Sequence, residues 1–266
     1  MIRVGTVAYL NARPLVWGLD SQPERFQLRF EVPSKCASLL HDSAVDLSLI
    51  PSIEYVHRPA YQIVPDVAIT SFGPVASVAV FTNRPIAAVR TIAVDASSRT
   101  SVALLRVLCA QWFDIEPKFI RLPPDIPVML KRCDAALVIG DPALFADHDA
   151  LGVDKIDLGE EWTAMTNLPF VWAFWAGRPG VITPDDILAL QVARNAGVKE
   201  SDAIAREFCN TDEDQVELGA RYLRENIGYV LDDAGRAGLK KFLKATKELG
   251  VIHSDTTVTF YPSQDG

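Results

Sequence analysis

The sequence lacks the short motifs that bind nucleotides or activate a nucleophile. It contains no G-x-G-x-x-G, no G-x-x-x-x-G-K and no G-x-S-x-G, and its four histidines show no H-E-x-x-H spacing. These absences argue against a dinucleotide-binding fold, a P-loop enzyme, an α/β-hydrolase and a zinc protease. We therefore expect no nucleotide, no redox cofactor and no catalytic metal.

Cysteines and long apolar runs are also scarce. The four cysteines are scattered and form no C-x-x-C pair, so each is predicted to be a small buried apolar residue. No apolar run approaches the roughly 20 residues that span a bilayer, and the first residues do not resemble a secretion signal. These features predict a cytoplasmic protein without membrane contact. The cysteines are Cys36, Cys109, Cys133 and Cys209.

The charge balance is acidic. Among 266 residues, 26 lysines and arginines stand against 34 aspartates and glutamates, giving a formal charge of −8. A net acidic surface argues against nucleic acid as the main partner, but it leaves room for a local site that binds a small anion. We expect a small-molecule partner; the sequence leaves the oligomeric state open.

Short apolar strands alternate with amphipathic helices through the first two-thirds of the chain. This alternation is typical of parallel sheets covered by helices. The apolar aromatic stretch 168–176 is predicted to be a long strand that returns to the first unit. The predicted strands are 2–8, 26–32, 45–50, 67–70, 91–94, 118–121, 135–139 and 168–176. The predicted helices are 12–19, 33–42, 100–112, 128–132 and 141–146.

From Pro184 onward the pattern is helical only. The last predicted helix, 233–249, places Leu239, Leu243 and Leu249 inside and a row of lysines outside. Two βα units followed by such a tail predict a two-lobed α/β binding-protein architecture with a ligand cleft between the lobes. Lobe 1 is assigned to residues 1–83 plus 177–266, and lobe 2 to residues 84–176. The earlier tail helices are 185–195, 201–209 and 212–226.

Small polar residues follow the predicted strands, where the ligand of an open α/β sheet binds. Four hydroxyl residues surround Arg99 at a helix start, a place where backbone N–H groups and hydroxyls can hold a carboxylate. A plain helix cap by one serine is the alternative. The hydroxyls belong to Ser97, Ser98, Thr100 and Ser101. The other candidates at strand ends are Asn11, Ser52, Gly73, Ser77, Gly140 and Asp141.

Six segments resemble one known family in order and spacing. They are 4–15 (VGTVAYLNARPL), 71–77 (SFGPVAS), 98–102 (SRTSV), 138–141 (VIGD), 157–159 (DLG) and 168–171 (LPFV). Together they resemble the chorismate dehydratase family of the futalosine route to menaquinone, over residues 2 to 176.

The resemblance implies a type II periplasmic-binding-protein-like fold with a helical C-terminal segment. It also implies an enzyme, a cofactor-free lyase that removes water from chorismate, a dicarboxylate, to give 3-[(1-carboxyvinyl)oxy]benzoate. Asn11 and Ser77 match the family's catalytic positions. We hypothesise that the enolpyruvyl carboxylate of the substrate takes the proton itself, because the strand ends offer only Asp95 and Asp141 as acids or bases.

Other functions remain open at this point. A solute-binding protein for a small anion would use the same fold and cleft. A ligand-sensing domain of a transcription regulator is a further alternative. The related dihydroxynaphthoate synthase is disfavoured, because Tyr9-Leu10-Asn11 stands where that enzyme carries Ser-Pro and Asp.

Overall fold

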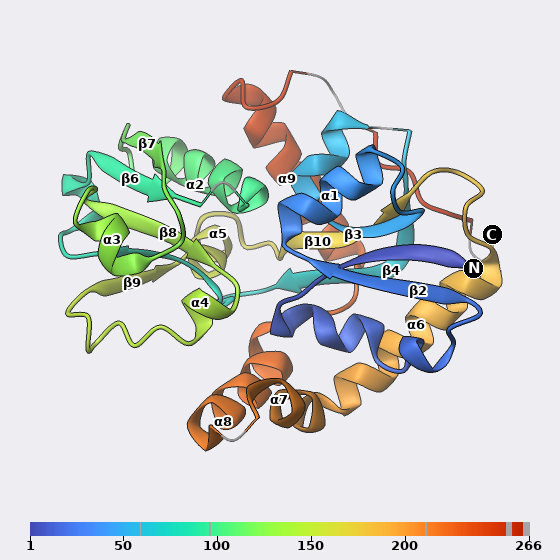
Figure 1. Cartoon of the computed structure of the whole chain (residues 1–266). Coiled ribbons are helices and arrows are strands. Elements are labelled where there is room, and N and C mark those ends of the chain that lie inside the picture. The colour runs from blue at the N-terminus through green and yellow to red at the C-terminus, as the bar shows by residue number, and fades with distance from the viewer. Residues whose placement is uncertain (59, 96, 211, 254–256, 263–266) are drawn as a thin grey trace.

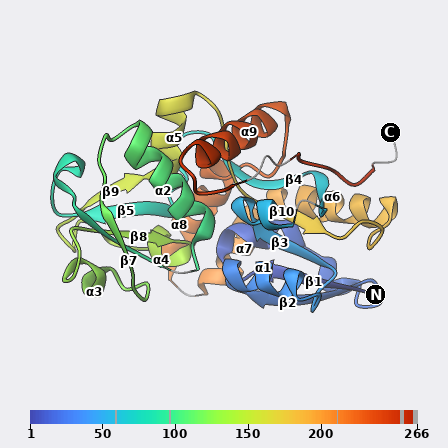
Figure 2. The ribbon, with the colours of Figure 1, turned by 90° about the horizontal axis from the view of Figure 1, so that it is seen from above.

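The chain folds into two lobes, each built on a five-stranded mixed sheet (Figure 1). A computed structural model describes residues 1–58, 60–95, 97–210, 212–253 and 257–262. The two sheets lie side by side when the molecule is seen from above (Figure 2). The two-lobed α/β prediction is therefore confirmed.

The first sheet has the strand order β2-β1-β3-β10-β4. Its first three strands run parallel, as the strand–helix–strand pattern predicts. The strand β10 runs antiparallel between β3 and β4, so the predicted return of the aromatic stretch to the first unit is confirmed. The strands are β1 (Ile2–Val7), β2 (Phe26–Glu31), β3 (Leu47–Pro51), β4 (Gln62–Ser71) and β10 (Phe170–Gly177).

The second sheet repeats this plan with the order β7-β6-β8-β5-β9. Three strands are parallel, and β5 lies antiparallel between β8 and β9. The sequence pattern missed both β5 and β9, which have only five and four residues. The strands are β5 (Val78–Thr82), β6 (Thr91–Val94), β7 (Lys118–Arg121), β8 (Ala135–Ile139) and β9 (Asp154–Asp157).

The sheet pairing moves two strands across the predicted lobe boundaries. The strand β5 precedes residue 84 but pairs in the second sheet, and β10 falls almost wholly within 84–176 but pairs in the first. Both are antiparallel strands whose partners are distant in sequence, so chain order alone does not assign them. The chain thus passes between the sheets at residues 72–77 and again after β9.

Helices cover both sheets and form the C-terminal segment. The predicted helix 12–19 is replaced by 3₁₀ turns, because Pro14 lies inside it and Gly18 adopts a positive φ of 73°. The predicted helix 212–226 ends as α8 at Arg221 and continues as a π-helical turn, Tyr222–Asn226. The helices are α1 (Pro33–His41), α2 (Arg99–Gln111), α3 (Ile126–Leu130), α4 (Asp141–Leu144), α5 (Leu158–Thr166), α6 (Pro184–Lys199), α7 (Ser201–Cys209), α8 (Glu213–Arg221) and α9 (Asp233–Glu248). The 3₁₀ helices are η1 (Leu10–Val16), η2 (Leu19–Ser21), η3 (Ser52–His57) and η4 (Ile86–Ala88).

Aromatic packing ties the last helix to the region where the chain returns to the first sheet. The ring of Phe170 lies 5.3 Å from that of Trp162 and 4.9 Å from that of Phe242, both edge-on. These rings come from β10, α5 and α9. Two predictions of burial were wrong: Leu249 is 39% exposed just past the end of α9, and Cys209 is only partly buried.

One buried carboxylate, that of Asp157, joins the two crossings, the segments in which the chain passes between the sheets (residues 72–77 and the residues that follow β9). It caps α5 by accepting hydrogen bonds from the N–H groups of Gly159 and Glu160, at 2.8 and 3.1 Å. It also accepts the N–H groups of Val75 and Ala76, at 3.0 and 2.6 Å, from the other crossing. Ala76 has a positive φ of 61°, a costly conformation for a residue with a Cβ atom. The carboxylate thus stabilises the strained loop that leads into β5.

No helix within the described ranges is both long and apolar enough to cross a membrane. The longest, α6 and α9, have 16 residues each and carry several charged side chains.

We predict that Asp157→Asn destabilises the protein by about 2 kcal/mol or more, because an amide offers one acceptor oxygen where two charged ones receive four N–H groups. Urea unfolding of both proteins measures this loss. Asp154→Asn, at an exposed position of the same strand, is the control for the loss of one charge. Equal stabilities of the Asp157→Asn variant and the wild type would contradict the idea that this carboxylate acts as a clamp between the two crossings.

Candidate active site

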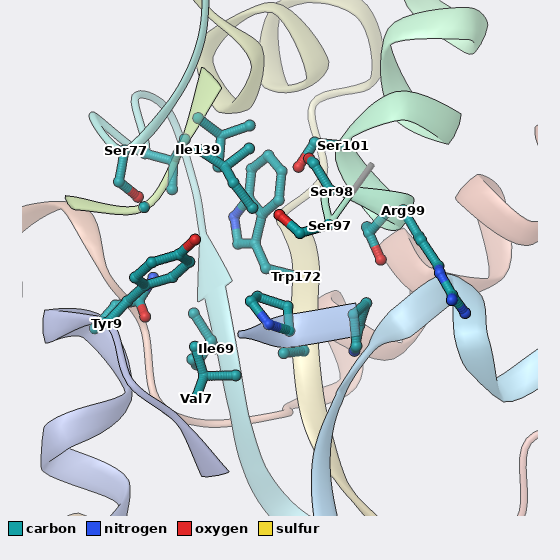
Figure 3. A pocket seen from close by; sticks show the side chains of 18 residues that line it. Val7, Tyr9, Ile69, Ser77, Ser97, Ser98, Arg99, Ser101, Ile139 and Trp172 are labelled. Carbon is teal, nitrogen blue, oxygen red and sulfur yellow. The ribbon is translucent and has the colours of Figure 1, made fainter. Parts of the chain in front are cut away.

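A cavity lies between the lobes (Figure 3). Its volume is about 570 Å³, including the part that is open to solvent. Its lining comes from the ends of strands in both sheets and from the start of α2. Apolar side chains form much of the wall, with the indole of Trp172 at the back. The other apolar side chains that line it include Val7, Ile69, Val75, Val78 and Ile139.

Most of the predicted site residues meet in this cavity, although their roles remain predictions. The cavity brings together residues from η1, from the crossing before β5, from α2 and from the end of β8. Three candidates, Ser52, Gly73 and Asp141, are not among its lining residues. Those that line it are Asn11, Ser77, Ser98, Arg99, Thr100, Ser101 and Gly140.

The start of α2 faces the cavity, and the hydroxyl of Ser98 there has no partner among the described residues, whereas that of Thr100 accepts the N–H of Ile53 at 3.2 Å. The hydroxyl of Ser98 caps no backbone N–H group of the helix, contrary to the plain-cap alternative. Its Oγ is buried and has no hydrogen-bond partner among the described residues. The positive end of a 13-residue helix and an unpartnered hydroxyl therefore lie at the same wall, an arrangement that suits a carboxylate.

Arg99 lines the cavity, but its charged end is held outside it. The guanidinium Nη1 lies 2.8 Å from Oε2 of Glu54, which is 1% exposed and belongs to η3 of the first sheet's lobe. In Figure 3 the side chain of Arg99 runs away from the cavity. His41 approaches the same carboxylate oxygen at 3.2 Å. Arg99 thus joins the lobes in this conformation.

A second contact joins the lobes on the other side of the cavity. The carboxylate of Asp141, at the start of α4, accepts the N–H of Leu10 at 3.0 Å. Beside it, Gly140 has a positive φ of 68°, and a Cβ atom there would lie 2.6 Å from the ring of Tyr9. Gly140 and Asp141 therefore dock one lobe on the segment that follows β1 in the other.

Tyr9 brings a neutral phenol to the cavity. Burial, together with the nearby carboxylates of Asp95 and Asp141, raises the pKa of Tyr9 to about 12, although a hydrogen bond with Ser97 acts in the opposite direction. The phenol therefore stays protonated at neutral pH. Its hydroxyl points into the cavity in Figure 3.

Ser77 and Asn11, the predicted catalytic pair, are linked by a buried tyrosine. The Tyr222 hydroxyl donates a hydrogen bond to Oγ of Ser77 at 2.7 Å and also interacts with the Asn11 side chain. Oδ1 of Asn11 is buried and has no partner among the described residues. The cavity is thus lined by a hydroxyl that is held by a buried phenol and by an amide whose oxygen has no partner in the described part of the chain.

The remaining candidates have other surroundings. The hydroxyl of Ser52 is fully buried beside the cavity residue Pro51, without a partner among the described residues. Gly73 donates its N–H to Oγ1 of Thr163 at 2.8 Å and so supports the crossing. Ser52 follows Pro51 of the lining and Gly73 precedes Val75 by two residues, so strand-end reasoning included both.

Two side chains at or beside the cavity, Trp172 and Tyr222, were missed by sequence reasoning. A third, Tyr9, follows the first strand directly and was expected at the cleft by the strand-end rule, but it was not chosen as a site residue. Trp172 lies within the aromatic strand β10, where nothing in the sequence distinguishes a core ring from a cavity wall. Tyr222 comes from the helical tail, about 145 residues from Ser77.

Within the part of the chain that the structure describes, no group of three or more His, Cys, Asp or Glu side chains could hold a metal ion. Apart from Arg99, whose guanidinium is turned away, the polar groups of the described cavity lining are hydroxyls, an amide and peptide groups such as those at the start of α2. This donor set suits hydrogen bonding to an anion.

The family of the chain follows from a sequence comparison. The model of the menaquinone biosynthesis family matches residues 2–248. The chain belongs to this family. The chain is also similar to a chorismate dehydratase of Thermus thermophilus. The two sequences are 30% identical over 262 residues, which cover 91% of this chain and 94% of that protein.

Solved structures of low sequence identity share the fold. A protein of Archaeoglobus fulgidus aligns with a TM-score of 0.75 at 16% identity, covering 94% of this chain and 98% of its own. The aliphatic sulphonate binding protein of Escherichia coli aligns with a TM-score of 0.64 at 16% identity, covering 99% of this chain and 94% of its own. The predicted periplasmic-binding-protein-like fold is confirmed.

Asp141 is expected to make stability depend on pH. Burial raises the pKa of its carboxyl to about 6, and the Leu10 N–H and the Arg13 charge offset this only in part. Because the pKa is lower in the unfolded chain, about 4, the folded state loses stability as the pH rises from about 4 to about 6.

Asp141→Asn keeps an acceptor for Leu10 but does not titrate. We predict that the unfolding free energy of the wild type, minus that of Asp141→Asn, falls between pH 4 and 6 and is flat above. Urea unfolding across pH 3.5–7.5 measures this difference, with Asp154→Asn as the control for lost charge. Parallel profiles for the wild type and Asp141→Asn would contradict the prediction.

Proposed function

We propose that the protein is a chorismate dehydratase, a carbon–oxygen lyase that converts chorismate to 3-[(1-carboxyvinyl)oxy]benzoate and water in menaquinone biosynthesis. The observation that carries the proposal is the neutral, hydroxyl-lined cavity between the lobes, in a chain similar to a chorismate dehydratase. The cytoplasmic location expected from the sequence is part of the same proposal.

In this proposal the start of α2 binds a substrate carboxylate. Backbone N–H groups at a helix start, together with the free hydroxyl of Ser98, form a neutral site that favours negative charge. The apolar wall with Trp172 would cover the face of the substrate ring. Since the guanidinium of Arg99 is paired with Glu54, the start of α2 carries the anion binding in this conformation.

The reaction is an elimination that ends in an aromatic ring. The proton on the ether-bearing ring carbon leaves first, and its electron pair is delocalised into the ring carboxylate. The C–O bond from the ring to the neighbouring hydroxyl then breaks, and the electron pair of that bond leaves with the hydroxyl group. The hydroxide combines with the proton that was removed to give water, and the delocalised pair completes the aromatic ring. The enzyme must stabilise the extra negative charge and assist the departing oxygen.

Fixed neutral donors suit this chemistry, because preorganised dipoles stabilise developing charge without reorganising. Among the described residues that line the cavity, Arg99 alone is charged, and its guanidinium is turned away. A base must therefore come from elsewhere, and we assign it to the enolpyruvyl carboxylate of the substrate. Asn11 and Ser77 orient the leaving hydroxyl and the charged intermediate.

We predict that the purified protein converts chorismate, without added cofactor or metal, to an aromatic product lighter by one water. Liquid chromatography with mass detection measures the product against a control without enzyme. Unchanged chorismate with saturable binding would instead indicate an anion-binding protein. If the protein neither converts nor binds chorismate, the assignment to chorismate is overturned.

We further predict that Asn11→Ala and Ser77→Ala each lower kcat about 10²-fold or more, the scale for removing one preorganised polar group that stabilises developing charge. The same chromatographic assay gives kcat and KM for both variants. Asn83→Ala, at an exposed position, is the matched control and should leave kcat unchanged. Full activity in both cavity variants would refute their catalytic assignment.

A further inference from the structure

One buried phenol, that of Tyr222, contacts both side chains assigned to catalysis but does not itself line the cavity. Tyr222 is 1% exposed, and its hydroxyl lies 2.7 Å from Oγ of Ser77. The side chain of Asn11 also lies close enough to this phenol to lower its pKa. Tyr222 therefore lies behind Ser77 and Asn11, on the side away from the ligand.

The hydrogen-bond partners of Ser77 and Asn11 define what each side chain offers to a ligand. The phenol has one proton, and the geometry directs it to Oγ of Ser77. Ser77 is then the acceptor in that bond, and its own proton is free to point into the cavity. Oδ1 of Asn11 lacks a partner among the described residues and so remains an acceptor.

The surrounding chain holds Tyr222 firmly in this place. It begins a π-helical turn, an irregular element often found at functional sites. After this turn, Gly228 exchanges two backbone hydrogen bonds of 2.8 Å with Thr70, and a Cβ atom at Gly228 would lie 2.4 Å from Oγ1 of Thr70. Asn226 donates to the carbonyl of Pro74 at 2.9 Å. The turn is thus fastened to the crossing segment that carries Ser77.

We propose that Tyr222 is a positioning residue, which turns the Ser77 hydroxyl proton into the cavity beside the unpartnered amide oxygen of Asn11. This inference rests on the proposed dehydratase function. A donor and an acceptor held side by side match a hydroxyl group of the ligand, which accepts from Ser77 and donates to Asn11. In the elimination, that hydroxyl is the one that leaves.

The protonation state of Tyr222 is consistent with this role. Burial raises the pKa of the phenol well above its ordinary value, so it remains a donor at every pH at which the protein is folded and active. A group so deeply buried has no route by which to exchange its proton with the ligand directly. It acts through Ser77.

The test is a double-mutant cycle on the full chain with chorismate as substrate. Tyr222→Phe removes the hydroxyl and keeps the ring, so we expect kcat to fall about tenfold with KM within about threefold. In the Ser77→Ala background the same substitution should change kcat by less than about twofold, because its target is gone. Equal losses in both backgrounds, or a change in KM alone, would overturn the inference.

Tyr229→Phe is the matched control. Tyr229 lies seven residues further along, is also buried, and its hydroxyl has no hydrogen-bond partner in the described part of the chain. Deleting that hydroxyl should leave kcat unchanged. A loss in Tyr229→Phe as large as in Tyr222→Phe would overturn the inference, because it would indicate a general effect on packing.

A fluorinated tyrosine at position 222 separates positioning from stability. It keeps the phenol and the packing, so kcat should stay within about twofold of wild type even if Tyr222→Phe folds poorly. A tenfold loss with the fluorinated side chain would overturn the inference. If the wild type does not convert chorismate at all, the proposed function fails and this inference with it; if it does and the cycle is additive, the inference alone fails.

Discussion

The arrangement of the site depends on one buried carboxylate, that of Asp157, because it fastens together the two places where the chain passes between the sheets. Four backbone N–H groups converge on it, two from the start of α5 and two from the loop before β5. That loop ends at Ser77, so the clamp determines where the cavity hydroxyl lies. A Cβ atom at Gly159 would lie 2.8 Å from the carbonyl oxygen of Gly73, so the close approach of the two crossings also requires glycine there.

A second constraint is the separation of charge from the ligand space. The ionic contact of Arg99 joins the lobes outside the cavity, on the buried carboxylate of Glu54. Inside, hydroxyls and helix N–H groups provide the polarity. This division lets an ion pair join the lobes while the cavity stays neutral, which suits an anionic ligand whose charge must be redistributed during a reaction.

The same fold serves binding proteins such as the sulphonate binding protein, which shows how little of the activity resides in the architecture. In this chain the polar side chains at the cleft come from widely separated segments. The helical tail contributes as well, since its π-helical turn reaches the crossing and places Tyr222 behind Ser77. A tail that seems in sequence to be an appendage is therefore part of the site.

The sequence by itself determined the elements with strong local signals. Alternating apolar strands and helices predicted the two α/β units, and the hydroxyls around Arg99 predicted a polar helix start at the cleft. Only the tertiary structure decided that β5 and β10 exchange sheets, that the guanidinium of Arg99 turns toward Glu54, and that Asp141 accepts the N–H of Leu10. Periodicity and spacing report on residues near one another in the chain, whereas strand pairing, side-chain direction and the burial of Tyr222 depend on contacts between residues a hundred or more positions apart or on opposite lobes.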